Sequence, residues 1–249
     1  MGTTDNVMSA RPYDPPPAAC VFDAYGTIFD FGSAVHRRGA GIGASAATLI
    51  ETWRAKQLQY TWLRSLQGHY VNFEQITADA LDYALEASEI RDGTLRDDLL
   101  SLFSQLDAFP DAVGALRELR TAGFPCWILS NGTPAMLGAA VRAAGLDSLL
   151  DGVLSVESVR AYKPDPRVYQ LAVDQLRLPA DRIAFISANG WDAYAAAAFG
   201  FSAIWCNRTG QPSERLPGRP AHEVRSLHAL PGILRLPSAD HRGAAPSAV

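Results

Sequence analysis

Short apolar runs alternate with amphipathic segments along most of this chain, and this alternation constrains the fold more than any other feature. The runs typical of strands cover residues 19 to 23, 125 to 130, 152 to 155, 183 to 187 and 203 to 206. Segments with helical spacing separate most of them, at residues 111 to 122, 134 to 144, 165 to 177 and 192 to 199. Strands that alternate with helices build a mostly parallel sheet. The sequence therefore predicts an α/β protein with a doubly wound sheet.

The stretch from residue 31 to residue 108 departs from this alternation. It has no convincing strand, and it contains helical runs at residues 45 to 67, 73 to 88 and 92 to 106. We predict a helical cap inserted after the first strand, above the edge of the sheet where open α/β proteins carry their sites. Such a cap can exclude water from a reaction.

The expected domains follow from this insertion. The core comprises residues 18 to 30 and 109 to 236, and the cap comprises residues 31 to 108. The proline-rich residues 1 to 17 and the small, polar residues 237 to 249 are predicted to be loose tails without function.

The composition argues against several classes of function. The chain has 249 residues, of which 48% are hydrophobic and 19% charged, so that it can bury a full core. Its formal net charge of -4 and its scattered basic residues argue against nucleic acid as a partner. No apolar segment approaches the roughly 20 residues that span a bilayer, and the N-terminus lacks the pattern of a signal peptide. We therefore expect a cytoplasmic protein without a membrane partner.

The three cysteines are predicted to be reduced residues of the core. Cys20, Cys126 and Cys206 all lie in strand-like runs, where a thiol packs as a small hydrophobe. Their odd number and the lack of Cys-x-x-Cys spacing argue against a disulfide framework and against a zinc site.

Polar residues follow three of the predicted strands. They are Asp23, then Ser130 and Asn131, and then Ser187, Asn189 and Asp192. Because the carboxyl ends of parallel strands lie side by side, these groups should meet in one crevice. Lys163, held between Tyr162 and Pro164 in a stiff loop, can reach the same crevice. A lysine there would keep Asp23 ionised and able to attack.

Each of these residues also has a structural alternative. An aspartate before a glycine turn is common without any chemistry, and the serine and asparagine after the second strand suit an ordinary turn. Thr27 either caps the following segment or turns back to hold Asp23. Lys163 is either a solvated loop residue or the partner of Asp23. Asp192 either caps a helix or orients Lys163 or a hydrolytic water, and the joint occurrence at three strand ends favours a functional site.

Within the predicted cap, an arginine stands in an apolar stripe. Four residues follow one another at a spacing of four, namely Ile50, Arg54, Leu58 and Trp62. An arginine there is either a structural ion-paired or snorkelling side chain, or a clamp for an anion between cap and core. A second apolar side of the same helix, with Leu49, Trp53 and Tyr60, packs against more helix or against a second subunit.

Taken together, these motifs resemble the haloacid dehalogenase superfamily and, within it, the L-2-haloacid dehalogenases of type II. The resemblance extends from about residue 19 to residue 230. Its most specific parts are Asp23-Ala24-Tyr25-Gly26-Thr27, Trp53-Arg54 through Leu66, Leu129-Ser130-Asn131-Gly132, Tyr162-Lys163-Pro164-Asp165 through Tyr169, and Ser187 through Asp192. The resemblance implies a Rossmann-like core with the predicted cap.

The resemblance also implies a two-step hydrolysis of short L-2-haloalkanoic acids. Asp23 would attack C2 in line with the carbon–halogen bond, which inverts C2 and leaves an aspartyl ester. Arg54 and Asn131 would receive the departing halide. Ser130, helped by backbone N–H groups near Tyr25, would hold the substrate carboxylate. Hydrolysis of the ester would then release a D-2-hydroxy acid.

In the second step, water would attack the acyl carbon of the ester. The residues implied to position this water are Ser187, Asn189 and Asp192, with Lys163 nearby. Thr27 would support Asp23 by a hydrogen bond, and Tyr169 would support Lys163. A small apolar pocket would be lined by Tyr25, Leu58, Phe73 and Trp191.

Tyr25 separates this interpretation from a phosphatase. Phosphatases of similar pattern need a second aspartate two residues after the nucleophile as a general acid, whereas a departing halide needs no proton. Magnesium prefers carboxylate ligands, and Tyr25 offers none beside Asp23, so no metal and no other cofactor is expected. The alternatives are a metal-dependent phosphatase or phosphomutase of the same superfamily, and a non-catalytic binding module on the same fold.

Two positions depart from the family pattern. Ala55 stands where members often carry a glutamine, and Ala188 replaces a common serine. These changes bear on pocket size and on contacts to water.

The second apolar side of the cap helix also predicts a homodimer.

Overall fold

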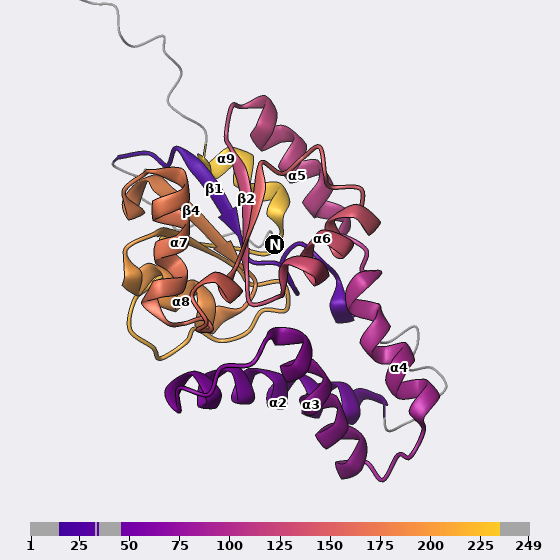
Figure 1. Cartoon of the computed structure of the whole chain (residues 1–249). Coiled ribbons are helices and arrows are strands. Elements are labelled where there is room, and N and C mark those ends of the chain that lie inside the picture. Colours follow the sequence, from indigo (N-terminus) through magenta and orange to yellow (C-terminus); the bar gives the residue numbers. More distant parts are fainter. Residues whose placement is uncertain (1–14, 33, 35–45, 235–249) are drawn as a thin grey trace, which may run out of the picture.

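The computed structural model describes residues 15–32, 34 and 46–234, which form a parallel sheet with a helical unit at its edge (Figure 1). Six strands are hydrogen-bonded in the order β3-β2-β1-β4-β5-β6, and these pairings are all parallel. The strands are β1 (Ala19–Phe22), β2 (Cys126–Ser130), β3 (Gly152–Ser155), β4 (Ile183–Ser187), β5 (Ser202–Cys206) and β6 (His222–Val224). The predicted α/β class is confirmed. The predicted tails lie outside the described residues, apart from residues 15–17.

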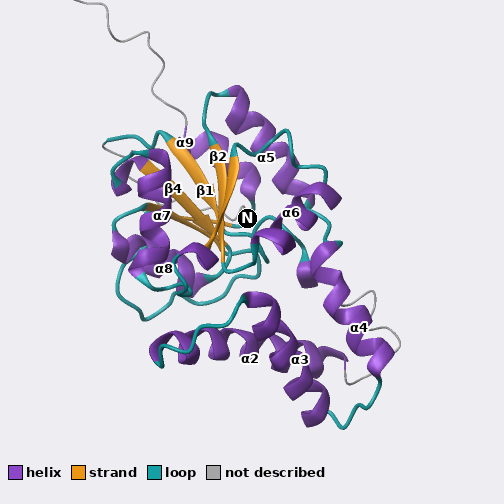
Figure 2. Ribbon diagram, viewed as in Figure 1, coloured by secondary structure: helices purple, strands orange, loops and turns teal. Residues whose placement is uncertain are grey.

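Helices cover both faces of this sheet. They are α5 (Pro110–Thr121), α6 (Pro134–Ala143), α7 (Pro166–Leu176), α8 (Gly190–Phe199) and the short α9 (Leu230–Leu234). Figure 2 shows α5 and α6 on one side of the strands, and α7 and α8 on the other. Three of these helices begin with proline, which suits the first helical position because its missing N–H would have no partner inside the helix.

The central strand β1 is buried on both faces. All of its residues have an exposed fraction of 0%, as expected of a parallel strand that helices cover on either side. Phe22 is paired with Ile128 of β2 and with Ile186 of β4. The strand order reverses at β1, because β2 and β3 lie on one side of it and β4 to β6 on the other. Open α/β sheets bind ligands at such a point, beyond the carboxyl ends of the strands.

The predicted insertion is a helical unit at the carboxyl edge of the sheet (Figure 1). Its helices are α2 (Ala46–Leu66), α3 (Phe73–Ala87) and α4 (Gly93–Ser101), followed by a 3₁₀ turn at Leu102–Ser104. Asn72 caps α3 by accepting a hydrogen bond from the backbone N–H of Gln75 at 2.9 Å. Asp92 caps α4 in the same way, accepting from the N–H of Leu95 at 3.0 Å. The three predicted helical runs are confirmed, although the last helix ends earlier than predicted.

Helix α2 has a regular buried face. Its members Leu49, Trp53, Gln57 and Thr61 follow one another at a spacing of four and have an exposed fraction of 0%. The indole N–H of Trp53 donates to the backbone oxygen of Thr77 on α3 at 2.9 Å. Truncating so buried a tryptophan to alanine costs about 3–5 kcal/mol. Leu49 and Trp53 are therefore buried within this chain, which corrects the alternative that they face a second subunit.

The cysteines are free and buried, as predicted. Cys20 lies in β1, Cys126 in β2 and Cys206 in β5. The sequence does not predict β6 or α9, because elements of three and five residues carry too little periodicity to be recognised.

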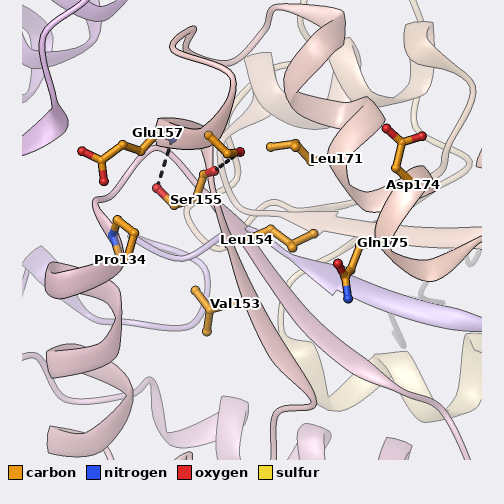
Figure 3. Close-up of a pocket in the computed structure, with 9 residues that line it drawn as sticks. Pro134, Val153, Leu154, Ser155, Glu157, Leu171, Asp174 and Gln175 are labelled. Carbon is orange, nitrogen blue, oxygen red and sulfur yellow. Dashed lines mark hydrogen bonds between the residues drawn. The ribbon is translucent and has the colours of Figure 1, made fainter.

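A concave pocket of about 660 Å³ lies beside β3 at the outer edge of the sheet (Figure 3). It is lined by Pro134, Val153, Leu154, Ser155, Glu157, Ser158, Leu171, Asp174 and Gln175. The Ser155 hydroxyl accepts from the backbone N–H of Glu157 at 3.2 Å and donates to the backbone oxygen of Gly132 at 2.7 Å. The residues predicted to carry chemistry are not among those that line this pocket.

Candidate active site

Asp23 lies directly after β1, and four side chains hold its carboxylate. Oδ1 accepts a hydrogen bond from Lys163 Nζ at 3.0 Å. Oδ2 accepts from Thr27 Oγ1 at 3.0 Å, from Asn189 Nδ2 at 2.8 Å and from Ser187 Oγ at 3.4 Å. The residue is only 7% exposed. Because both oxygens are engaged, the carboxylate keeps one orientation and its charge is compensated within the protein.

Thr27 connects the end of β1 to the end of β4. Its Oγ1 accepts a hydrogen bond from the backbone N–H of Ala188 at 2.8 Å. A hydroxyl has a single proton, so the proton of Thr27 is directed to Asp23. Ala188 contributes through its backbone here, and the alanine that departs from the family pattern leaves this contact intact.

Lys163 is buried between two carboxylates. Its Nζ lies 3.0 Å from Asp23 Oδ1 and 2.8 Å from Asp192 Oδ2. Burial alone lowers the pKa of Lys163, but Asp192 and Asp23 outweigh it, and the pKa is raised above its usual value. The ammonium therefore stays charged and offsets the two neighbouring negative charges.

Tyr169 holds the other oxygen of Asp192. Its hydroxyl donates to Asp192 Oδ1 at 2.7 Å. Burial, together with the nearby carboxylate of Asp192, raises the pKa of Tyr169 well above its usual value, so that the phenol keeps its proton. Burial also raises the pKa of Asp192, whereas Lys163 opposes that rise. The prediction that Tyr169 supports Lys163 by a hydrogen bond is corrected in one respect, because the hydroxyl acts through Asp192.

The turn after β2 brings Ser130 and Asn131 to the same edge. Asn131 Oδ1 accepts a hydrogen bond from the backbone N–H of Lys163 at 3.1 Å. This contact orients the side-chain amide, so that its NH₂ group points away from Lys163. Ser130 Oγ accepts from the backbone N–H of Gly132 at 3.2 Å, which leaves the hydroxyl proton free for another acceptor.

Arg54 approaches from the cap, on α2. Its Nη1 donates to Gln57 Oε1, and its guanidinium carbon lies 5.1 Å from the ring centre of Phe31. Burial lowers the pKa of Arg54 from its usual value, while the negative charge of Asp23 acts in the opposite direction. A guanidinium stays protonated throughout the physiological range, so Arg54 is a cation close enough to Asp23 for the two charges to interact.

Aromatic rings form the apolar wall beside Asp23. Tyr25 stacks on Phe73 with ring centres 5.9 Å apart, and the edge of Phe103 meets Tyr25 at 5.3 Å. Burial raises the pKa of Tyr25, so its phenol is neutral and cannot replace an aspartate ligand. Trp191 on α8 meets Trp62 on α2 at 5.6 Å, which joins core and cap. Leu58, also predicted for this wall, lies half-buried on α2, one turn after Arg54.

Sequence reasoning missed several residues that support this site. Phe103 belongs to the apolar wall but gives no signal beyond its hydrophobicity. Arg208 donates to the backbone oxygen of Thr27 at 2.9 Å and pairs with Asp111 at 2.8 Å. The sequence feature that could have revealed Arg208 is its position just after a predicted strand. Gln57, beside Arg54, is a polar residue on an apolar helix face.

Two features are absent from the part of the chain that the structure describes. Among residues 15–32, 34 and 46–234, no group of three or more His, Cys, Asp or Glu side chains is placed to hold a metal ion. Within the same residues, no helix is both long and apolar enough to cross a membrane.

The fold and this strand-end site correspond to a known class of hydrolase. A family model for haloacid dehalogenase-like hydrolases matches residues 17–200. A solved dehalogenase with an intermediate complex is 43% identical, with a TM-score of 0.86, and the match covers 88% of this chain and 97% of that one.

Named relatives narrow the class further. The (S)-2-haloacid dehalogenase 1 of Pseudomonas sp. (strain CBS-3) is 45% identical over 88% of this chain and 97% of its own length. The L-2-haloacid dehalogenase of Xanthobacter autotrophicus, solved with chloropropionic acid covalently bound, is 33% identical with a TM-score of 0.81. That match covers 88% of this chain and 98% of the other. The chain therefore belongs to the haloacid dehalogenase superfamily and, within it, to the L-2-haloacid dehalogenases. The predicted resemblance is confirmed.

Proposed function

We propose that this protein hydrolyses L-2-haloalkanoic acids to D-2-hydroxy acids and halide through an ester on Asp23. The observation that carries this conclusion is a carboxylate held at a strand end by Lys163, Thr27 and Asn189, with Tyr25 where a phosphatase needs an acid. A halide leaves without a proton, so the tyrosine is no obstacle. The similarity to (S)-2-haloacid dehalogenases, and to one with chloropropionic acid covalently bound, supports the same reaction.

In the first step, an Asp23 oxygen bonds to C2 while the carbon–halogen bond breaks, and the halide leaves with the bonding electrons. Arg54 and the amide NH₂ of Asn131 stabilise the developing negative charge. Ser130 donates its free hydroxyl proton to the substrate carboxylate. The wall that keeps water from Asp23 comprises Tyr25, Leu58, Phe73 and Trp191.

In the second step, a water oxygen bonds to the acyl carbon of the Asp23 ester, and the bond from that carbon to the ester oxygen on C2, which came from Asp23, breaks. One proton of the water ends on the hydroxyl of the product, and the other leaves to solvent. Ser187, Asn189 and Asp192 position the water. The charge of Lys163 stabilises the carboxylate that is regenerated.

The other candidate functions lack a favouring observation. A metal-dependent phosphatase would need a proton donor that Tyr25, with its raised pKa, does not supply at neutral pH. The comparisons support a dehalogenase rather than that alternative. A non-catalytic binding module does not need the buried Asp23, Lys163 and Asp192 together, since buried charges are costly.

We further propose that residues 18–30 and 109–236 form the core domain and residues 31–108 the cap, which the position of α2 to α4 at the sheet edge supports (Figure 1). A cytoplasmic location stays a prediction.

A homodimer through the cap helix is also proposed, at the exposed end of α2. Leu63 is 44% exposed there and Leu66 is 85% exposed. Sedimentation at micromolar concentration should show a dimer that Leu66→Asp dissociates, and a monomeric wild-type protein would contradict this.

Halide release tests the main proposal. Chloride should be released from L-2-chloropropionate and not from the D form, and the rate should be the same with EDTA as with magnesium. An aryl phosphate with magnesium serves as the parallel assay. Phosphate release without chloride release would replace this function by that of a phosphatase.

A further inference from the structure

A short chain of buried polar side chains crosses the contact between α2 and α3. Gln57 on α2 is 0% exposed and Thr77 on α3 is 2% exposed. Gln57 Nε2 donates to Thr77 Oγ1 at 2.7 Å, and Gln57 Oε1 accepts from Arg54 Nη1. Polar groups this deeply buried cost stability unless they are fully hydrogen-bonded, so a simple helix contact would use apolar residues here.

The donors and acceptors in this chain permit only one arrangement. Thr77 Oγ1 donates its single proton to the backbone oxygen of Phe73 at 2.6 Å. Toward Gln57 it can therefore only accept, which requires the NH₂ group of that amide to face Thr77. The carbonyl oxygen of Gln57 is then left to face Arg54. A flipped amide would oppose two acceptors at Thr77 and two donors at Arg54.

We propose that Gln57 and Thr77 are positioning residues that orient the Arg54 guanidinium toward the departing halide. This inference rests on the proposed function. The same turn of α3 contributes Phe73, whose ring stacks on Tyr25 beside Asp23 at 5.9 Å. The polar chain thus connects the Arg54 guanidinium to the turn of α3 that contributes to the wall of the site.

The neutrality of Gln57 is part of this role. A carboxylate at this position would also accept from Arg54, but its negative charge would neutralise much of the guanidinium in a site of low dielectric. An amide holds the guanidinium and leaves its charge for an incoming anion. Gln57→Glu is nearly isosteric, so the side chain should still hold the Arg54 guanidinium in place while it neutralises the charge that the halide needs.

The experiment measures halide release in single turnovers with L-2-chloropropionate and L-2-bromopropionate. The chloride rate should fall on the order of 100-fold in Thr77→Val, because Arg54 is misplaced. It should fall similarly in Gln57→Glu, because the charge of Arg54 is neutralised. The bromide rate should fall less, because the better leaving group needs less stabilisation of charge. Hydrolysis of the ester formed on Asp23 should keep its wild-type rate, since Arg54 does not act in that step.

Two controls separate positioning from stability. Thr77→Ser keeps the hydroxyl and should restore chloride release to within a few-fold of wild type. Thr61→Val removes another hydroxyl from the buried face of α2, one that donates to the backbone oxygen of Leu58 at 2.6 Å and lies outside the chain to Arg54. It should change the melting temperature without changing the ratio of bromide to chloride rates.

The outcomes are distinguishable. If wild type releases halide and Gln57→Glu slows chloride and bromide equally, or slows neither, the positioning role is wrong. Equal ratios of the bromide rate to the chloride rate in Thr77→Val and Thr61→Val would also overturn the positioning role. If the wild-type protein releases no halide from either substrate, the proposed function itself fails. Gln57→Glu keeps the test decisive even if Thr77→Val does not fold.

Discussion

The two sides of the candidate site are held in different ways. On the core side, Asp23 is fixed by four side chains that come from a strand-end turn, from the Lys163 loop and from the end of β4. On the cap side, Arg54 is held by one amide of its own helix and by the ring of Phe31. The sheet therefore fixes the position of the proposed nucleophile, whereas the packing of two helices fixes the residue proposed to receive the leaving group.

The same loop joins these two sides. Tyr162, directly before Lys163, donates its hydroxyl proton to the backbone oxygen of Val71 at 2.7 Å, and its backbone N–H donates to Ser65 Oγ at 3.2 Å. Its ring stacks on Tyr70 with centres 5.2 Å apart. A displaced cap would therefore act on Tyr162, the residue next to Lys163. Because the two sides are proposed to act in different steps, kinetics should still tell damage to one side from damage to the other.

The largest effect should come from a substitution of Asp23, the proposed nucleophile. Asp23→Asn should lower halide release by about 10⁴-fold or more, because a neutral amide does not displace a halide. The matched control is Asp174→Asn, which changes an exposed carboxylate on α7. The measurement is ion-selective detection of chloride with a purified sample. Substantial release by Asp23→Asn would remove Asp23 from the reaction.

Loss of the cation on the core side should have the next largest effect. Lys163→Met removes the charge between Asp23 and Asp192, and burial then raises the pKa of Asp192 without the opposing effect of the lysine, so Asp192 should take up a proton more readily. We expect halide release to fall about 10³-fold at pH 7 and to recover in part as the pH rises. The pH–rate profile checks this, and a profile with the wild-type shape would contradict it.

The same lysine gives stability a dependence on pH. Its pKa is raised in the folded protein, since the two carboxylates outweigh burial. A group with a higher pKa in the folded state stabilises the fold below its unfolded pKa, and this contribution is lost as the pH rises through the folded pKa. The free energy of unfolding should therefore fall above about pH 10.4, and it should fall less in Lys163→Met. Parallel curves for the two proteins would exclude this contribution.

A substitution on the cap side should have a smaller effect, and this effect should be confined to one step. Arg54→Ala should slow halide release by about 10²-fold to 10³-fold, as the loss of one preorganised donor does elsewhere. The hydrolysis of the ester should be nearly unchanged, because the halide has already left. Burst kinetics with L-2-chloropropionate separate the two steps. If both steps slow equally, Arg54 supports the whole site and not only the leaving group.

How much the sequence predicts differs between the same two sides. On the core side, an apolar run followed by Asp23 and a glycine turn places the end of β1 to within a residue. Parallel pairing then brings Ser187 beside it without further information. Arg208 could have been found in the same way, because it follows β5, but its partner Asp111 is 97 residues away in the chain.

On the cap side, periodicity predicts helices but not how they are rotated against one another. Gln57 is visible in the sequence as a polar residue on an apolar face. Its contact with Thr77 joins positions 20 residues apart on two helices, and a rotation of α3 by one residue would remove it. The contact between Phe103 and Tyr25 depends on the same packing. These contacts follow from tertiary structure, and no local pattern contains them.

The smallest predicted effect tests the connection between the two sides. Tyr162→Phe removes one hydrogen bond and leaves the backbone oxygen of Val71 without its partner, which should lower the free energy of unfolding by about 1 kcal/mol. The ring and its stacking on Tyr70 remain, so the chemistry should change little. Denaturant titration measures the loss, with Tyr83→Phe as the control, because that ring is 43% exposed on α3. If Tyr162→Phe also lowers the rate of ester hydrolysis, the cap reaches the core side of the site through the Lys163 loop. If the rate holds, the two sides are coupled in structure but independent in chemistry.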